Sequence, residues 1–345
     1  MKGTMKAVVK PSAAPGAQIA TVPIPEIGPD EILVKVRATA ICGTDLHIYR
    51  WDPWAQERLH PPLVFGHEFC GDVVEVGERV TGVEKGDFVS AETHVTCGTC
   101  RQCRTGNAHI CQDLKILGVD INGCFAEYVK VPAINAWKVD PSVPVEVAAI
   151  HDPLGNAVHS AMSVNMLGRN VAVVGCGPIG LVCVAIAKTA GASRVVAVEV
   201  NEYRAQLAAK LGADVVVNPA RESLKEALLA QSDGIGVDIV LEMSGHPDAI
   251  RQSFAGLAQG GTVVMLGIPP KPMELDFANA VVFREAKVLG ITGRLVWETW
   301  FEVAALLRGG LDVRPVITHT FRLDEFEKAM ELALSGNAGK IVLYP

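Results

Sequence analysis

The chain has 345 residues, a length that favours two hydrophobic cores over one. Apolar residues make up 49% and charged residues 20%, with 33 glycines and 20 prolines, which is the profile of a soluble α/β protein and excludes a disordered one. The formal net charge of -7, with no basic stripe, argues against a nucleic-acid partner.

Neither export nor a membrane span is indicated. The first residues lack an apolar core and a small-residue cleavage site. The longest apolar run, residues 171–187, is interrupted by glycines and a proline, which favours a buried strand, turn and helix over a membrane helix. Nine cysteines without an export signal point to metal ligands or reactive thiols. We expect a cytoplasmic protein without a membrane partner.

Up to about residue 150, short β-rich runs alternate with turns. These runs cover residues 31–37, 71–77, 87–90 and 125–131. Their pattern predicts a small, mostly antiparallel β domain. Residues 51–62 combine prolines and tryptophans without a clear period, so we expect a loop there.

The stretch from Cys42 to His47 follows the first of these runs and contains side chains that can bind a metal or transfer a proton. A thiolate at Cys42 can bind zinc. The Thr44 hydroxyl and the His47 imidazole, spaced i and i+3, can face the same way on a helical turn and pass a proton. A buried cysteine followed by a helix cap would also fit this stretch.

Further along the chain are groups that could complete a metal site with Cys42. His67 offers an imidazole nitrogen and Glu68 a carboxylate oxygen, and Asp152 is a candidate fourth group. Three protein ligands would leave one coordination position open for a substrate oxygen.

A second metal site is predicted from four cysteines spaced C-x2-C-x2-C-x7-C. They are Cys97, Cys100, Cys103 and Cys111. Four thiolates close a tetrahedral shell around zinc, which is typical of a structural site. The bacterial iron–sulfur motif has a different cysteine spacing and a proline after a cysteine, so this pattern does not match it. The acidic net charge argues against a zinc ribbon that binds nucleic acid.

After about residue 155 the rhythm changes to strands alternating with helices. The strand-like runs are 171–174, 194–198, 214–217, 237–241, 262–266 and 287–291, and the helical segments are 179–189, 202–211, 222–230 and 247–258. This alternation predicts a doubly wound parallel sheet.

The last 50 residues break the alternation. We expect a helix from about Trp297, a strand near 315–318, a helix over 324–334 and a strand over 340–343. Their simplest place is back against the first domain. The predicted domains are therefore residues 1–155, 156–295, and 296–345 as a return to the first.

A G-x-G-x-x-G pattern lies where the strand at 171–174 hands over to a helix. Gly175 permits the turn, Gly177 lets the backbone approach a pyrophosphate, and Gly180 lets the helix pack on the sheet. Glu199 ends the next strand, where a carboxylate can bind the adenosine ribose and would repel a 2′-phosphate. This favours NAD over NADP. Arg204 alone would be read as an exposed helix arginine that pairs with Glu199 or solvent.

These motifs resemble the zinc-dependent medium-chain dehydrogenases, from about residue 5 to the end of the chain. The resemblance rests on the Gly66-His67-Glu68 motif, the four-cysteine lobe and the Gly175 fingerprint. It implies a GroES-like, mostly antiparallel β catalytic domain plus a Rossmann doubly wound parallel-sheet domain, one catalytic and one structural zinc per chain, and a homotetramer.

Within that family, the stretches 42–48, 51–55 and 152–159 and His94 resemble the branch that oxidises the 3-hydroxyl of L-threonine. Polyol dehydrogenases usually have serine where this chain has Thr44, and they lack its Gly-Asn-Ala-Val-His run. The resemblance thus implies L-threonine as the small-molecule substrate, NAD as the hydride acceptor, and a site in the cleft between the domains.

The resemblance also assigns roles to residues. Cys42, His67 and Glu68 would hold the catalytic zinc, Thr44 and His47 would form the proton relay, Asp152 would assist the relay near the zinc, and His94 would help select the substrate. The residues implied for NAD are Ile179, Glu199, Arg204, Leu266, Gly267, Ile268, Ile291 and Thr292. His151 departs from the family, since an apolar residue is expected at this position.

Two alternatives remain open at this stage. A polyol or 2,3-butanediol dehydrogenase of the same family would use the same chemistry on another substrate. A dinucleotide-binding protein that has lost catalysis would be expected to lack Cys42, His67 or the relay pair, and this chain has all of them.

Overall fold

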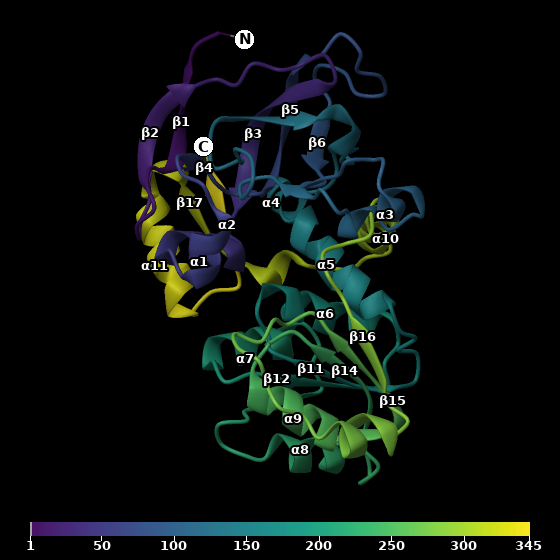
Figure 1. Ribbon diagram of the computed structural model, residues 1–345. Coiled ribbons are helices and arrows are strands. Elements are labelled where there is room, and N and C mark those ends of the chain that lie inside the picture. Colours follow the sequence, from purple (N-terminus) through teal and green to yellow (C-terminus); the bar gives the residue numbers. More distant parts are fainter. Residues whose placement is uncertain (1) are drawn as a thin grey trace. The chain divides into compact units, whose positions relative to one another are not determined.

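The computed structural model describes residues 2–345, which form two compact units (Figure 1). Unit 1 holds the residues up to Asp152 together with Leu295–Trp300 and Ile317–Pro345, and unit 2 holds Pro153–Arg294 and Phe301–Val316. Residues 301–316 cluster with unit 2, whereas we expected all of 296–345 to return to the first domain.

Unit 1 is built on a seven-stranded, mostly antiparallel sheet in the order β10-β6-β5-β3-β18-β17, with β9 also paired to β3. Its strands are β3 (Glu31–Ala40), β5 (Glu68–Val76), β6 (Phe88–Ala91), β9 (Tyr128–Pro132), β10 (Ala136–Lys138), β17 (Ile317–Arg322) and β18 (Lys340–Tyr344). Smaller sheets are formed by β1 (Thr4–Lys10), β2 (Gln18–Pro23) and β4 (Leu63–Val64), and by β7 (His94–Val95) and β8 (Lys115–Ile116).

The central strand of unit 1 explains how the sequence closes this core. β3 buries most of its side chains and pairs with β5, β9 and β18. Its apolar residues join Phe65, Phe125 and Phe326 in one buried cluster, where the three rings contact one another. The C-terminal segment thus completes the sheet that the N-terminal segment begins.

The helices of unit 1 are short. They are α1 (Gly43–Arg50), α2 (Pro53–Arg58), α3 (Arg101–Arg104), α4 (Val145–Ala149) and α11 (Phe326–Ser335), with single turns at Ala108–Ile110, Ala133–Asn135 and Leu323–Glu325. The prediction of a loop throughout 51–62 was wrong, because α2 lies inside it. Asp52 caps this helix by accepting a hydrogen bond from the Ala55 N–H, and Pro53 occupies the first helical position.

Unit 2 contains the predicted parallel sheet, in the order β13-β12-β11-β14-β15-β16. The strands are β11 (Asn170–Val174), β12 (Arg194–Val198), β13 (Val215–Val217), β14 (Val237–Glu242), β15 (Leu257–Met265) and β16 (Lys287–Gly290). The helices are α5 (His151–Met162), α6 (Pro178–Thr189), α7 (Glu202–Lys210), α8 (Leu224–Ala230), α9 (Pro247–Ala255) and α10 (Glu298–Arg308), with short turns at Ala278–Val282 and Arg314–Val316. The first two residues of α5 and the first three of α10 belong to unit 1.

Both faces of this sheet are buried, as expected for a doubly wound fold. Ala172 and Val174 of β11 pack in a cluster with Leu228 of α8 and Phe254 of α9. The alternate residues Val171 and Val173 are equally buried and point to the opposite face, where α6 contacts β11 and β12. The strand order reverses between β11 and β14, and folds of this kind bind ligands at such a position.

One boundary in unit 2 differs from the prediction. The helix expected over 247–258 ends at Ala255, because Gly256 closes it and Leu257 already pairs with Val237 of β14. Among residues 2–345, no helix combines the length and the apolar character needed to cross a membrane.

Candidate functional site

Strand register in unit 1 brings the first predicted metal group together. Ala40 at the end of β3 lies opposite Glu68 at the start of β5. Cys42 follows β3 by two residues and His67 directly precedes β5, so the two chain ends meet. Ligand atoms of Cys42, His67 and Glu68 lie within 4.8 Å of one another.

The Asp45 carboxylate lies beside both Cys42 and His67. Its Oδ2 accepts a hydrogen bond of 2.8 Å from the Cys42 backbone N–H, and its Oδ1 lies 3.8 Å from His67 Nδ1. Asp45 is fully buried and His67 nearly so. At 3.8 Å the two groups form no hydrogen bond, so Asp45 acts on His67 through its charge.

A buried ion pair holds one oxygen of Glu68. The Lys340 ammonium in β18 donates to Glu68 Oε1 at 2.5 Å and to the Ile41 carbonyl at 2.8 Å. Burial alone would lower the pKa of Lys340, but the Glu68 and Cys42 charges outweigh it and raise that pKa. Within residues 2–345, Glu68 Oε2 has no hydrogen-bond partner although it is buried.

This donor set fits a zinc ion. A sulfur, an imidazole nitrogen and a carboxylate oxygen are ligands that zinc accepts, and the unpartnered Oε2 of Glu68 is a buried atom that a cation would satisfy. Burial disfavours a charged His67, yet Cys42 and Asp45 raise the pKa of its imidazole to about 10. Cys42 and Asp45 therefore favour a positive charge at this position.

The predicted relay residues lie on α1. The Cys42 thiol is 3.7 Å from Thr44 Oγ1, and His47 follows one turn later with its side chain 54% exposed. His47 Nδ1 forms a short hydrogen bond with Asp52, whose pKa is lowered because this bond and the Ala55 N–H outweigh its partial burial. The His47 imidazole is therefore open to solvent and held by Asp52.

Asp152 lies near the metal group but is not one of the three residues that form it. Its Oδ2 accepts a 2.7 Å hydrogen bond from Thr93 Oγ1, and its charge contributes to raising the pKa of both His67 and Glu68. It is 4% exposed. This position suits a residue that acts on the site's protons without binding the metal.

His94 is positioned by a buried carboxylate, that of Glu92. Glu92 Oε1 accepts a hydrogen bond of 2.8 Å from the His94 N–H, and its Oε2 accepts one of 2.8 Å from the indole N–H of Trp300. Asn135 donates to the carbonyls of Glu92 and His94, which fixes the same turn. The loop between β6 and β7 is therefore rigidly held.

His151, the residue that departs from the family, stacks on Trp300 with ring centroids 6.0 Å apart. Its Nδ1 lies 3.2 Å from the carbonyl oxygens of Val147 and Ala148, so this nitrogen carries the proton. Burial lowers the pKa of His151 to about 4, although these two hydrogen bonds act in the opposite direction. A neutral ring therefore stands beside Asp152 at neutral pH.

The four-cysteine group gathers around α3 and the turn Ala108–Ile110. Its sulfurs are close but not bonded, with 3.5 Å between Cys100 and Cys103 and between Cys97 and Cys111, and 3.9 Å between Cys100 and Cys111. Backbone N–H groups point at the sulfurs, as in thiolate metal sites: Cys97 N donates to Cys111 Sγ and Cys100 N to Cys97 Sγ.

Thiol acidity agrees with this arrangement. Hydrogen bonds from Thr99 and from backbone amides lower the pKa of Cys97 to about 6, and backbone hydrogen bonds lower that of Cys100. Burial raises the pKa of Cys103 to about 12, so this thiol would lose its proton on binding a cation. The group fits a closed zinc shell, with four thiolates and no position left for a substrate.

In unit 2 the glycine pattern takes the expected turn between β11 and α6. Gly175 has φ +89°, and a side chain at Gly180 would collide with the Gly175 carbonyl oxygen at 1.9 Å. No atom lies within 4 Å of a side chain built at Gly177, which caps the N-terminus of α6. Space and backbone N–H groups thus coincide where a pyrophosphate would bind.

Glu199 directly follows β12, and the glycine loop depends on it. Its Oε2 accepts a hydrogen bond of 2.8 Å from the Cys176 N–H, and its Oε1 accepts one of 2.8 Å from the Asn201 N–H. Each carboxylate oxygen can accept a further bond. Arg204 lies half-buried on α7, where Asn201 caps the helix through the Arg204 N–H.

The residues implied for the remainder of the dinucleotide also lie in unit 2. Ile179 is in the first turn of α6, Leu266, Gly267 and Ile268 follow β15, and Ile291 and Thr292 follow β16. Buried Glu242 at the end of β14 organises the neighbouring loop: its carboxylate accepts hydrogen bonds from Ser244 and Gly245, and its carbonyl accepts from the N–H groups of Leu266 and Gly267.

Several of these residues escaped sequence analysis. Lys340, Glu92 and Glu242 carry no motif. Lys340 and Glu92 reach Glu68 and Trp300, which only folding brings near, whereas the Glu242 carboxylate binds its own loop. Asp52 had a local signal, because an aspartate before a proline is typical of a helix cap. Asp45 could have been found from its position inside the Cys42 stretch.

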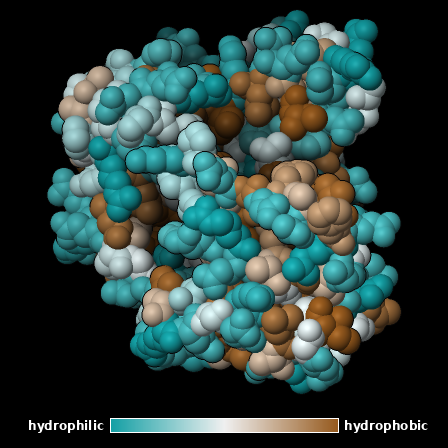
Figure 2. All heavy atoms as spheres, turned by 60° about the horizontal axis from the view of Figure 1, so that its bottom comes forward, coloured by the Kyte–Doolittle hydropathy of each residue, from teal (hydrophilic) through white to brown (hydrophobic). Residues whose placement is uncertain are grey.

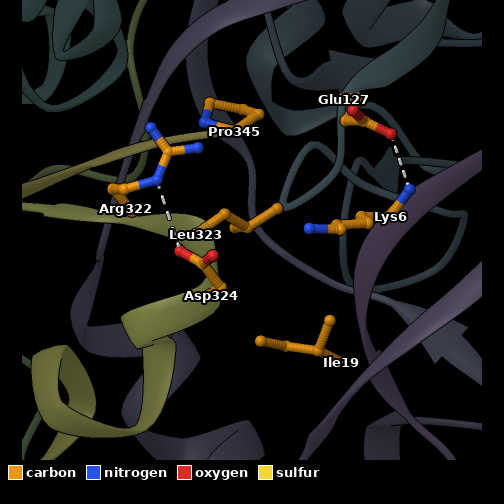
Figure 3. Close-up of a pocket in the computed structure, with 7 residues that line it drawn as sticks. All are labelled: Lys6, Ile19, Glu127, Arg322, Leu323, Asp324 and Pro345. Atoms are coloured by element: carbon orange, nitrogen blue, oxygen red, sulfur yellow. Dashed lines mark hydrogen bonds and ion pairs between the residues drawn. The ribbon is translucent and has the colours of Figure 1, made fainter.

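A further pocket in unit 1 lies between β1, β2 and the segment after β17 (Figure 3). It is lined by Lys6, Ile19, Glu127, Arg322, Leu323, Asp324 and Pro345. The Lys6 N–H donates to Glu127 at 2.7 Å, and Arg322 pairs with Asp324. None of the predicted site residues lines this pocket.

Comparison with known proteins decides the family. The alcohol dehydrogenase GroES-like domain matches residues 28–141, and the zinc-binding dehydrogenase domain matches residues 178–309. The chain belongs to the zinc-dependent medium-chain dehydrogenases. The predicted family and fold class are confirmed, and the protein is an oxidoreductase of the zinc-dependent alcohol dehydrogenase type, with a small-molecule substrate and a dinucleotide cofactor.

Relatives within this dehydrogenase family are close. The L-threonine 3-dehydrogenase of Caldanaerobacter subterraneus subsp. tengcongensis is 52% identical over 347 residues, covering 100% of both chains. A crystal structure from Sinorhizobium meliloti, described as a zinc-binding dehydrogenase bound to NADP, has a TM-score of 0.91 at 32% identity and covers 99% of this chain and 100% of its own. The 2R,3R-butanediol dehydrogenase of Bacillus subtilis has a TM-score of 0.90 at 30% identity, with 99% of each chain covered.

The buried neutral His151 predicts an acid-dependent loss of stability. Its pKa lies near 4 in the folded protein and near 6.5 when unfolded, so the unfolded chain binds the extra proton between these values and stability falls as the pH drops below about 6.5. From pH 7 to pH 5 the wild type should lose about 2 kcal/mol more unfolding free energy than His151→Phe. Urea unfolding at both pH values measures this. Equal losses would show that His151 does not titrate as described.

Proposed function

We propose that this dehydrogenase oxidises the 3-hydroxyl of L-threonine to 2-amino-3-oxobutanoate with NAD. The hydride on the carbinol carbon goes to the nicotinamide, giving NADH, and the hydroxyl proton goes to solvent. The assignment of L-threonine as the substrate rests on the 52% identity with a threonine dehydrogenase across the full length of both chains.

The metal group supports the chemistry. Cys42, His67 and Glu68 would hold zinc, which when bound supplies Lewis acidity that lowers the pKa of a substrate alcohol. Lys340 keeps one Glu68 oxygen occupied and leaves the other available. The Asp45 carboxylate lies 3.8 Å from His67 Nδ1 and adds negative charge beside the metal group.

The protein's own residues then handle the proton. The Thr44 hydroxyl, next to the Cys42 thiol, can take part in hydrogen bonding to a substrate oxygen and relay its proton. His47, one turn further on α1 and mostly exposed, delivers the proton to solvent while Asp52 orients its ring. Asp152, held by Thr93, assists by its negative charge.

The cofactor side is proposed from unit 2. Gly175, Gly177 and Gly180 admit the pyrophosphate at the N-terminus of α6. Ile179, Glu199 and Arg204 would surround the adenosine half, and the loops after β15 and β16 the nicotinamide half. The carboxylate of Glu199 disfavours a 2′-phosphate, which supports NAD rather than NADP.

2,3-Butanediol is the second candidate substrate. It requires the same metal, relay and cofactor, and a butanediol dehydrogenase shares the fold at a TM-score of 0.90. Its identity of 30%, against 52% for the threonine enzyme, makes it the weaker candidate. An amino acid also differs from a diol in its two charges, which gives the assay below a clear contrast.

A cytoplasmic homotetramer completes the proposal. The edge strand β16 and the turn before it expose hydrophobic side chains, among them Val282 at 64%, Phe283 at 75% and Val288 at 41%. Figure 2 shows hydrophobic side chains gathered in several groups among polar ones on the face in view. Exposed apolar side chains of this size favour self-association.

The substrate is tested by a steady-state screen of the zinc-loaded protein. We expect a rise in NADH absorbance with L-threonine and NAD, and kcat/KM at least about tenfold lower with NADP, sorbitol or 2,3-butanediol. L-allo-threonine serves as the matched stereochemical control. Oxidation of a diol without oxidation of threonine would contradict the substrate assignment but would still agree with the zinc chemistry.

Two variants test the proton-relay role of His47 and the NAD-binding role of Glu199 separately. His47→Asn should lower kcat by about 100-fold, the typical worth of a positioned proton-transfer group, with little change in NAD affinity. Glu199→Gln keeps one acceptor oxygen, for the N–H of Cys176 or of Asn201, and removes the charge. It should raise the KM for NAD and reduce discrimination against NADP with kcat nearly unchanged. Steady-state kinetics and NADH titration measure both. If each variant affected kcat and NAD affinity equally, the assignments would be wrong.

A further inference from the structure

Helix α5 contacts the loop that follows β16 at three positions in unit 2. His159 Nδ1 lies 3.0 Å from the Gly293 carbonyl oxygen. Asn156 Oδ1 accepts a longer hydrogen bond, 3.4 Å, from Arg294 Nη1. A side chain at Gly155 would lie 2.8 Å from the Arg294 side chain. Gly155, Asn156 and His159 belong to the Gly-Asn-Ala-Val-His run, which has no role in any step of the proposed reaction.

The first of these contacts fixes the tautomer of His159. A carbonyl oxygen only accepts, so Nδ1 must carry the proton and donate it to Gly293. Gly293 has φ +58°, the left-handed conformation that turns the chain sharply after Thr292. The histidine therefore holds the loop at its turn.

The second and third contacts confine the loop from the side. Arg294 is only 2% exposed although it carries a guanidinium group. Its aliphatic part packs where Gly155 leaves room, so a side chain at 155 would displace the Arg294 side chain from α5. Ile291 is tied at the other end, since its N–H donates to the Met265 carbonyl at 2.9 Å.

The loop so held consists of Ile291, Thr292, Gly293 and Arg294. It leaves the carboxyl end of β16, the edge of a parallel sheet at which dinucleotides bind. The proposed function places the nicotinamide half of NAD against Ile291 and Thr292, and the inference below rests on that placement. A loop whose backbone contacts a ligand gains affinity when it is fixed in advance.

We propose that His159 and Asn156 are positioning residues for the nicotinamide half of the cofactor. They act through the loop 291–294, which they hold in the conformation that receives the ring. Gly155 is small because Arg294 occupies the adjacent space. The run thus sets cofactor geometry rather than substrate choice.

The experiment compares NADH with ADP-ribose, which lacks the nicotinamide, by calorimetric titration of the full-length protein. His159→Leu should weaken NADH binding about five- to tenfold, the worth of one hydrogen bond of a bound loop, and change ADP-ribose binding less than about twofold. His159→Gln, which retains an N–H donor, should recover most of the affinity. Ser163→Ala removes a hydrogen bond of 2.7 Å to the Ser160 carbonyl at the exposed end of α5, and it is the matched control that should leave both ligands unaffected.

Two results would overturn the proposal. Equal weakening of NADH and ADP-ribose would show general damage to unit 2, and unchanged NADH binding would show that the loop needs no support from His159. Asn156→Ala provides a second test should His159→Leu not fold, with the same selective loss expected to a smaller degree. Because these titrations need neither zinc nor threonine, failure of the substrate proposal would leave their outcome unchanged.

Discussion

The metal group depends on the neutralisation of buried negative charge. Asp45 and Glu68 are fully buried and Asp152 nearly so, and Cys42 adds a thiol that binds metal as a thiolate. Burying such groups without compensation is costly. Lys340 supplies one positive charge through its ion pair with Glu68. A divalent cation between Cys42, His67 and Glu68 would supply the remaining positive charge. The same cation would both neutralise the buried acidic groups and serve the reaction.

This constraint links distant parts of the chain. Cys42 and Glu68 meet through the register of β3 and β5, whereas Lys340 arrives on β18, 272 residues after Glu68. The C-terminal return to unit 1 is therefore part of the metal group and more than a packing element. In unit 2, Glu199 and Glu242 each hold a loop at the end of a parallel strand by accepting hydrogen bonds from backbone N–H groups.

What could be predicted from sequence is what local spacing encodes. The glycine pattern between β11 and α6, the four cysteines and the Cys42 stretch each carry their chemistry within a few residues, and the alternation after residue 155 gave the parallel sheet. Partners distant in sequence could not be found this way: the pairing of Lys340 with Glu68, and of Glu92 with Trp300, depends on tertiary contacts. The helix within 51–62 was missed because three prolines outweighed the Asp52-Pro53 cap signal. The end of α9 was misplaced because Leu257 is apolar in either a helix or a strand, and only its pairing with Val237 decides.

The two zinc sites can be located by anomalous diffraction at the zinc absorption edge, on crystals of protein purified without chelators. We expect two peaks per chain. One should lie among Cys97, Cys100, Cys103 and Cys111, and the other among Cys42, His67 and Glu68, with Lys340 still paired to Glu68. Zinc confined to the four cysteines in fully zinc-loaded protein, with Cys42 and His67 left without metal, would contradict this expectation.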